Sequence, residues 1–562
     1  MRLQKLHIQN FRKIDDLTIN FPNGLCVIVG ENNAGKTAII DALRLMLLPS
    51  RDFDTLRITP DDFKYNSGFL DIEISCIFSN LTDQDEVHFQ ECLRNIGGEH
   101  FEVQLNTRVS FDEYSGRVNV KMWAGETEGG NLPSNFYNRI ASIYLQPLRD
   151  PEKGLRPSQN SQISRLISHL SDTQEKREEF EGIVQDANNR VKALESVINA
   201  QTDINEQINS IAGDELNQQT ELIFSDPSFR RIIAGLKPEI DGLPYELNGL
   251  GYNNLVFTAA TLGTLRSSPQ FSFRSILVEE PEAHLHPQLQ VLLLKHFENV
   301  ARPGTENEVQ VIASSHSPIL VSQAPIDSIV SVHEYHGQVH ATSIFSIDID
   351  AKIKRKLQRY LDATRGELFF SRRLLMVEGI AEVLLIPVLA KLAGGSLKES
   401  SVTLLNANGI NFNAFLPLFG ESRLKFPVVI LTDGDAKEIG GDMSQTASNL
   451  KAREEEIPNL CVKLSEITFE HELARSPELL PIMLNAFENL HPTLGKELKI
   501  EIATLDNNEE KAIYFFNKFI EKGVSKGEFA QELAWLIDES GHLTINSVPT
   551  YIQEAIHFLG VI

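Results

Sequence analysis

Cysteine is scarce in this chain of 562 residues. The four cysteines are Cys26, Cys76, Cys92 and Cys461, and no two of them form a CxxC pair. This scatter argues against a disulfide framework and against a zinc cluster. It fits a reducing compartment, and we expect a cytoplasmic protein.

A long uninterrupted hydrophobic run is also missing. The most apolar stretch, residues 374–392, contains Glu378 and Glu382. Two carboxylates inside a membrane span would be costly. The first twenty residues alternate polar and apolar side chains, unlike the unbroken apolar core of a signal peptide. We therefore expect no membrane partner.

Positive charge is in deficit. The chain has 52 Lys and Arg against 77 Asp and Glu, a net charge of −25. Nucleic-acid binding therefore requires a local basic patch that works against a repulsive overall field. One basic run offers such a patch, although a solvated charged helix explains most of its side chains equally well. The run comprises Lys352, Lys354, Arg355, Lys356, Arg359, Arg365, Arg372 and Arg373.

Length and composition predict a modular globular protein. Hydrophobic residues make up 42% of the chain and charged residues 23%, which is ordinary for globular domains. Short strand patterns dominate residues 1–154, and a helical insertion rich in Gln, Asn, Glu and Ser follows at 155–225. Strands return over 226–365, and residues 366–562 alternate strands with helices. We predict an α/β protein whose first and third segments form one ATPase domain and whose last segment forms a second α/β domain.

A phosphate-binding loop stands near the start of the chain. Residues 30–37 read GENNAGKT, which fits GxxxxGK[ST], and they lie between an apolar strand and a helical pattern. The glycines let backbone N–H groups wrap phosphate oxygens, while Lys36 reaches the outer phosphates and Thr37 offers a hydroxyl to Mg²⁺. The predicted ATP contacts are Asn32, Asn33, Gly35, Lys36, Thr37 and Ala38.

A second apolar strand ends in two adjacent acids, Glu279 and Glu280. This is where a P-loop ATPase holds Mg²⁺ with one carboxylate and polarises the attacking water with the next. Glu279 stands where an aspartate is usual. Its side chain is one methylene longer, which still allows it to bind a metal. Glu280 as the general base of ATP hydrolysis is a hypothesis.

These motifs together resemble the ABC-type ATPases of the structural-maintenance and DNA-repair kind. The resemblance implies that His316, at a strand end, is the switch histidine, and that Gln146 is the Q-loop glutamine. It also implies that Gly251, in the sequence LNGLGYNN, contacts the γ-phosphate of a partner subunit's nucleotide. ATP held between two such heads requires a dimer. The insertion at 155–225 is then either a dimerisation element or a solvated helical hairpin.

Acidic residues follow two apolar strands of the last segment. Glu378 ends one strand, with Glu382 one helical turn later, and Asp433 and Asp435 end another. In a parallel sheet these acids meet at the carboxyl edge. Carboxylates that converge there repel one another unless a cation lies between them, and ligands that are all oxygen suit Mg²⁺ or Mn²⁺.

This order of acids resembles the TOPRIM fold, and its place after an ABC-type head resembles the OLD (overcoming lysogenisation defect) family of nucleases, which includes the Gabija nuclease subunit and some retron effectors. The resemblance implies that Glu470, in TFEHEL, is a further metal ligand and that Lys526, in KGEFA, is a catalytic lysine. It also implies DNA as substrate, a homodimer or homotetramer, a role in anti-phage defence, and a helicase or a retron reverse transcriptase with its msDNA as partner. Asn408 and Gly409 are expected to form a turn under the site.

We therefore predict an ATP-binding, metal-dependent DNA endonuclease or nickase. Hydrolysis is preferred over topoisomerase chemistry, because none of the ten tyrosines has the sequence context of a tyrosine nucleophile. One alternative is an ATP-dependent DNA-repair or DNA-binding protein with a regulatory TOPRIM domain. Another is a sensor in which bound nucleotide holds the nuclease off.

Overall fold

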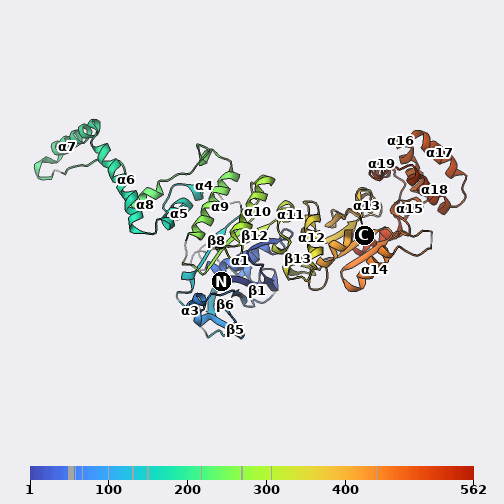
Figure 1. Ribbon diagram of the computed structural model, residues 1–562, viewed down its shortest axis with the longest axis horizontal. Helices are drawn as coiled ribbons and strands as arrows, with labels where there is room; N and C mark the ends of the chain where they lie inside the picture. The colour runs from blue at the N-terminus through green and yellow to red at the C-terminus, as the bar shows by residue number, and fades with distance from the viewer. Residues whose placement is uncertain are drawn as a thin grey trace. The chain divides into compact units, whose positions relative to one another are not determined.

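The computed structural model describes residues 1–48, 56, 58–65, 67–98, 100–129, 132–133, 135–147, 151–216, 218–267, 270–305, 307–409, 411–437 and 440–562. It forms two compact units. The first contains Met1 and residues 133–312, and the second contains residues 2–132 and 313–562. Figure 1 labels the elements of each unit.

An antiparallel sheet occupies the N-terminal part of the second unit. Its strands pair in the order β2-β1-β4-β6-β5, with β7 also paired to β6. The strands are β1 (Arg2–Phe11), β2 (Ile14–Asn20), β4 (Ile72–Ser79), β5 (Leu93–Gly97), β6 (His100–Asp112) and β7 (Arg117–Ala124). Buried and half-buried residues alternate along β4, as expected for a sheet with one face against the core. Helix α1 (Lys36–Leu47) contacts β1, β4 and β6.

Strand β3 (Leu25–Val29), which leads into the P-loop, is buried along its whole length. It pairs in parallel with β13 (Ile329–Tyr335), which forms an antiparallel hairpin with β14 (Gln338–Ser343). A strand buried on both faces needs apolar side chains on both, which explains the continuous LCVIV sequence of β3.

A four-stranded parallel sheet, with the order β16-β15-β17-β18, carries the last segment of the chain. Its strands are β15 (Arg373–Val377), β16 (Val402–Asn406), β17 (Val428–Thr432) and β18 (Leu460–Leu464). The following helices accompany it: α13 (Ile380–Leu392), α14 (Gln445–Glu456), α15 (Phe469–Ala474), α16 (Leu480–Leu490), α17 (Pro492–Ala503), α18 (Asn508–Glu521), α19 (Lys526–Glu539) and α20 (Thr550–Phe558). Because all four strands run in parallel, their carboxyl ends share one edge of the sheet.

The first unit contains two parallel strands, β8 (Ile140–Leu145) and β11 (Phe273–Glu279). Its helices are α4 (Pro151–Leu155), α5 (Gln162–Leu170), α6 (Gln174–Lys192), α7 (Glu195–Leu216), α8 (Phe229–Ala234), α9 (Leu250–Arg266) and α10 (Pro287–Val300). Helix α9 packs against β8, β11, α4 and α5. Figure 1 shows α7 at the end of α6, and both helices lie within the insertion predicted at 155–225.

The basic run departs from its prediction. Instead of one helix to Arg373, the chain forms α12 (Ala351–Tyr360) and a 3₁₀ helix (Arg365–Phe370). The break comes at Asp362, whose carboxylate accepts hydrogen bonds from the backbone N–H (2.8 Å) and guanidinium (2.8 Å) of Arg365.

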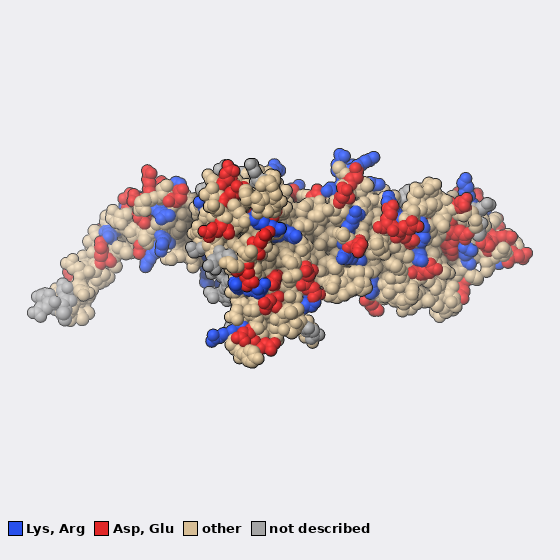
Figure 2. All heavy atoms as spheres, turned by 90° about the horizontal axis from the view of Figure 1, so that it is seen from below, with Lys and Arg blue, Asp and Glu red and all other residues tan. Residues whose placement is uncertain are grey.

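Several cations of this run already have acidic partners. Lys354 pairs with Asp327 at 2.7 Å, and Arg372 pairs with Glu31 at 2.5 Å. On the face of the molecule in Figure 2, acidic side chains are interspersed with basic ones. The ion pairs favour the structural interpretation of the run over a dedicated DNA path. No helix among the described residues is long and apolar enough to cross a membrane.

Candidate functional site

The P-loop has a shape that only its glycines allow. Gly30 has φ +152°, and a Cβ there would lie 1.9 Å from the carbonyl oxygen of Val332. Gly35 has φ +105° and Asn33 has φ 65°, so the loop turns through left-handed conformations. The Lys36 ammonium donates to the carbonyl oxygens of Gly30 (2.7 Å) and Glu31 (2.6 Å). The lysine therefore lies over the loop where outer phosphates of a nucleotide would bind.

The other predicted ATP contacts of the second unit lie in the loop, in the first turn of α1 and after β12. Asn32, Asn33 and Thr37 are exposed, and Ala38 is buried in the first turn of α1. His316 follows β12 (Gln310–Ser315) in a turn that the hydroxyl of Ser315 braces by accepting from the Ser317 N–H at 3.0 Å. These positions suit the predicted nucleotide contacts.

The remaining predicted ATP residues belong to the first unit. Glu279 ends β11 and is buried, and its Oε1 accepts a 3.4 Å hydrogen bond from the hydroxyl of Tyr144 on β8. Glu280 follows with φ 46°. Gln146 lies exposed just after β8. Gly251 opens α9, where a Cβ would lie 2.7 Å from the carbonyl oxygen of His284. The structure thus places the predicted ATP residues in both units.

The strand-end acids of the parallel sheet lie side by side. Strands β15 and β17 are adjacent, with Val377 opposite Leu431, and Glu378 and Asp433 follow their ends. The Glu378 Oε1 accepts hydrogen bonds from the hydroxyl of Thr432 and from the backbone N–H of Asp433 (3.1 Å). The predicted turn at Asn408 and Gly409 contacts the backbone of Glu378, because the Gly409 N–H donates to the Glu378 carbonyl at 2.7 Å.

The pKa values of two carboxyls in this cluster, those of Asp433 and Glu382, are raised. Burial, followed by repulsion from Glu378 and Glu470, raises the pKa of Asp433 to about 8, although the Ser465 hydroxyl donates to it at 2.9 Å. Burial also raises the pKa of Glu382, with repulsion from Glu470 and Glu378 adding to it. Mutual repulsion of this kind requires that the acids lie near one another.

Glu470 and Lys526 form an ion pair beside this cluster. Glu470 is buried in the first turn of α15, and its carboxylate pairs with the Lys526 ammonium at 2.9 Å. Lys526 begins α19, which packs against α13, the helix that carries Glu382. Burial opposes the charge of Lys526, but Glu470, Asp433 and Glu382 outweigh it and raise the pKa of Lys526.

Asp435 differs from the other predicted ligands. It has φ 53° and its N–H donates to the carbonyl of Ile467 at 3.0 Å, yet its side chain is exposed. Gly434 before it is required, because a Cβ there would lie 2.4 Å from the carbonyl oxygen of Ser465. Among the described residues, no group of three or more His, Cys, Asp and Glu side chains is arranged so that it could hold a metal ion. The donor chemistry still fits a divalent cation, which would offset the repulsion that raises the pKa values of Asp433 and Glu382.

Comparison with known protein families decides the relationship. The AAA ATPase domain model matches residues 1–115 and 119–321. The model described as Overcoming lysogenization defect protein-like, TOPRIM domain, matches residues 369–435. The chain belongs to the AAA ATPase domain family and carries an OLD-like TOPRIM domain. The predicted α/β architecture, an ATPase head with a TOPRIM domain, is confirmed. Together the two domains imply use of a nucleotide and a divalent metal.

The chain is also similar to individual proteins and to a solved structure. The chain is 22% identical over 469 residues to the Endonuclease GajA of Bacillus cereus (strain VD045), covering 78% of this chain and 76% of the relative. It is 25% identical over 411 residues to the OLD nuclease of Thermus scotoductus, covering 68% and 72%. The solved C-terminal region of the Burkholderia pseudomallei OLD protein matches 34% of this chain and 97% of its own, at 25% identity and a TM-score of 0.27.

The structure also brings residues to the OLD TOPRIM site that the sequence motifs did not single out. Thr432 and Ser465 bind the two strand-end acids through their hydroxyls. Tyr551, on α20, lies close enough to the acids that burial, followed by Asp433 and Glu472, raises its pKa well above the usual value. Thr432 directly precedes Asp433 and could have been found from that position. Tyr551 offered no signal, since only the packing of α20 on β17 and β18 brings it there.

Proposed function

We propose that this OLD-family chain is a nucleotide-regulated, Mg²⁺- or Mn²⁺-dependent endonuclease or nickase that hydrolyses DNA phosphodiester bonds. The adjacency of Glu378 and Asp433 at neighbouring strand ends carries the proposal. Support comes from the relatives named endonuclease and OLD nuclease. A role in anti-phage defence rests on the same relationship and on the Septu protein PtuA of Bacillus thuringiensis, 25% identical over 347 residues.

In the nuclease site, the acids, the hydroxyls beside them and Lys526 have distinct tasks. Glu378, Glu382, Asp433, Asp435 and Glu470 would hold the metal. A bound divalent cation supplies a Lewis acid for the scissile phosphate and for the attacking water. Thr432 and Ser465 keep the Glu378 and Asp433 carboxylates oriented. Lys526, fixed by Glu470, presents a positive charge that stabilises the additional negative charge of the transition state.

The ATPase residues bind and orient nucleotide. Lys36 would exchange the carbonyls of Gly30 and Glu31 for phosphate oxygens, and Thr37 would offer its hydroxyl to Mg²⁺. Glu279 is a further proposed Mg²⁺ ligand. Glu280 is the proposed general base, and His316, Gln146 and Gly251 complete the ABC-type set. Because Gly251 would serve a partner subunit's nucleotide, the proposal includes a homodimer or homotetramer. A helicase, or a retron reverse transcriptase with its msDNA, is the proposed further partner.

A plasmid assay tests this function. Supercoiled plasmid incubated with purified protein and Mg²⁺ or Mn²⁺ is expected to become nicked or linear, and excess EDTA is expected to stop the reaction, because the acids repel one another without a cation. Gel electrophoresis, with and without ATP, measures the cleavage and its inhibition by EDTA. Cleavage that persists in EDTA would contradict the metal site. An absence of cleavage with either metal, together with ATP-dependent DNA binding, would favour the DNA-binding alternative.

A further inference from the structure

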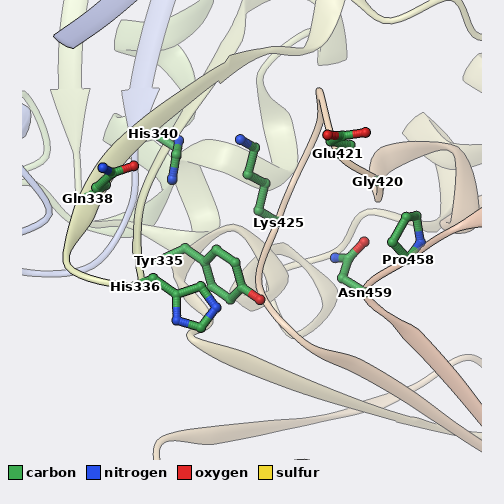
Figure 3. A pocket seen from close by; sticks show the side chains of 9 residues that line it. All are labelled: Tyr335, His336, Gln338, His340, Gly420, Glu421, Lys425, Pro458 and Asn459. Atoms are coloured by element: carbon green, nitrogen blue, oxygen red, sulfur yellow. The ribbon is translucent and has the colours of Figure 1, made fainter.

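A pocket of about 520 Å³ lies between the β13–β14 hairpin and loops of the nuclease sheet (Figure 3). The hairpin supplies one wall, and residues around Lys425 and Asn459 supply the other. None of the P-loop residues or strand-end acids lines it. Its volume is within the range of small-molecule sites.

The two walls are fixed to each other. The Lys425 N–H donates to the Nε2 of buried His333 at 3.2 Å, and the Thr342 hydroxyl donates to the carbonyl of Arg423 at 3.0 Å. The Asn459 amide donates to the carbonyls of Leu424 (2.9 Å) and Phe426 (2.7 Å). These hydrogen bonds give the pocket a defined shape before any ligand enters.

One side of the pocket is cationic. In Figure 3 the Lys425 ammonium extends toward the ring of His340. Neither side chain has a carboxylate partner within ion-pair distance in the described chain, and Glu421 is the acid that shares the lining. Burial, together with the charge of Lys425, lowers the pKa of His340. The Lys425 ammonium, with the His340 ring beside it, favours binding of an anion such as a phosphate.

The other side suits a planar ring. The rings of Tyr335 and His336 have centroids 3.9 Å apart and an interplanar angle of 54°. Aromatic faces of this kind stack on nucleobases. The Asn459 Oδ1 is buried and has no hydrogen-bond partner. A buried acceptor left unpaired is costly, and an N–H donor on the edge of a base would satisfy it.

We propose that this pocket binds a nucleoside monophosphate, with the phosphate at Lys425 and His340 and the base beside Tyr335 and Asn459. The inference goes beyond the proposed function, because neither ATP binding nor DNA cleavage uses these residues. The hairpin also packs against the P-loop, since a Cβ on Gly35 would lie 3.3 Å from a methyl group of Val339. A ligand here would therefore contact the element that supports the ATP site and the loop that leads into β17.

Isothermal titration calorimetry with AMP tests the proposal. The titration uses full-length Lys36→Ala protein, so that the P-loop does not dominate the signal. We expect saturable binding of one AMP per chain. Lys425→Met in the same background keeps the methylene stem and removes the charge, and should weaken binding at least about tenfold, since a charge-assisted contact contributes about that much. Lys398→Ala, which removes an exposed lysine outside the pocket, should leave the affinity unchanged.

Titrations with fragments of AMP test the phosphate side and the base side of the pocket separately. Adenosine and inorganic phosphate should each bind more weakly than AMP. His340→Gln provides a second variant if Lys425→Met does not fold, as judged by its melting temperature, and should also weaken AMP binding. AMP affinity that is unchanged in the variants, or an absence of AMP binding in the Lys36→Ala protein, would overturn the proposal. Inorganic phosphate binding as tightly as AMP would overturn the nucleotide assignment.

Discussion

Replacing Glu378 with glutamine is expected to reduce DNA cleavage about a thousandfold, equivalent to about 4 kcal/mol of transition-state stabilisation. Glutamine keeps an oxygen that accepts from the Thr432 hydroxyl and the Asp433 N–H, so the strand ends should stay in register. What it removes is the negative charge next to Asp433 that a divalent cation requires. Initial rates of plasmid nicking in Mn²⁺ measure the loss.

A matched control makes this result specific. Glu399→Gln changes an exposed glutamate of the same domain and should cleave as wild type does. The melting temperature of Glu378→Gln in EDTA should not fall, because one of several mutually repelling charges is gone. Wild-type cleavage by Glu378→Gln would place the nuclease chemistry elsewhere in the chain.

Lys36→Ala has the second large expected effect. The ammonium would make charge-assisted hydrogen bonds to nucleotide phosphates, and the loss of two such bonds predicts about a hundredfold weaker ATP binding or more. Buried Lys36 donates to the carbonyls of Gly30 and Glu31, and the melting temperature of Lys36→Ala checks that the loop keeps its fold. Fluorescent ATP-analogue titration and a phosphate-release assay measure binding and hydrolysis.

The effect of Lys36→Ala on DNA cleavage separates two roles for ATP. Reduced cleavage means that bound nucleotide activates the nuclease. Increased cleavage means that bound nucleotide holds it off, as in the sensor alternative. Lys398→Ala is a suitable control, because Lys398 is an exposed lysine outside the P-loop. ATP affinity that is unchanged in Lys36→Ala would contradict the P-loop assignment.

The strand-end acids could be predicted because local sequence determines them. An apolar run followed by an acid predicts a buried parallel strand with that acid at its carboxyl end, and two such strands bring Glu378 and Asp433 to one edge. The P-loop is similarly local, since its glycines and lysine lie within eight residues. The fold class follows from the same alternation of strands and helices.

Other features depend on packing between distant segments. The pairing of Glu470 with Lys526 joins α15 to α19 and was not predicted, because the family resemblance pointed only to each residue separately. Asp435 has the expected motif spacing, but its left-handed backbone leaves the side chain exposed. The ion pairs of the basic run could not be predicted, because the acids that pair with Lys354 and Arg372 lie outside the run. The roles of these site residues stay predictions.

Direct binding of Mn²⁺ tests the central claim, that the carboxylate cluster of the TOPRIM domain holds a catalytic divalent cation. Electron paramagnetic resonance of nucleotide-free protein, titrated with Mn²⁺, counts the bound ions. Wild type and Glu399→Gln should bind Mn²⁺ with equal affinity, and Glu378→Gln should bind it at least about tenfold more weakly. Equal Mn²⁺ binding by all three proteins would contradict the account.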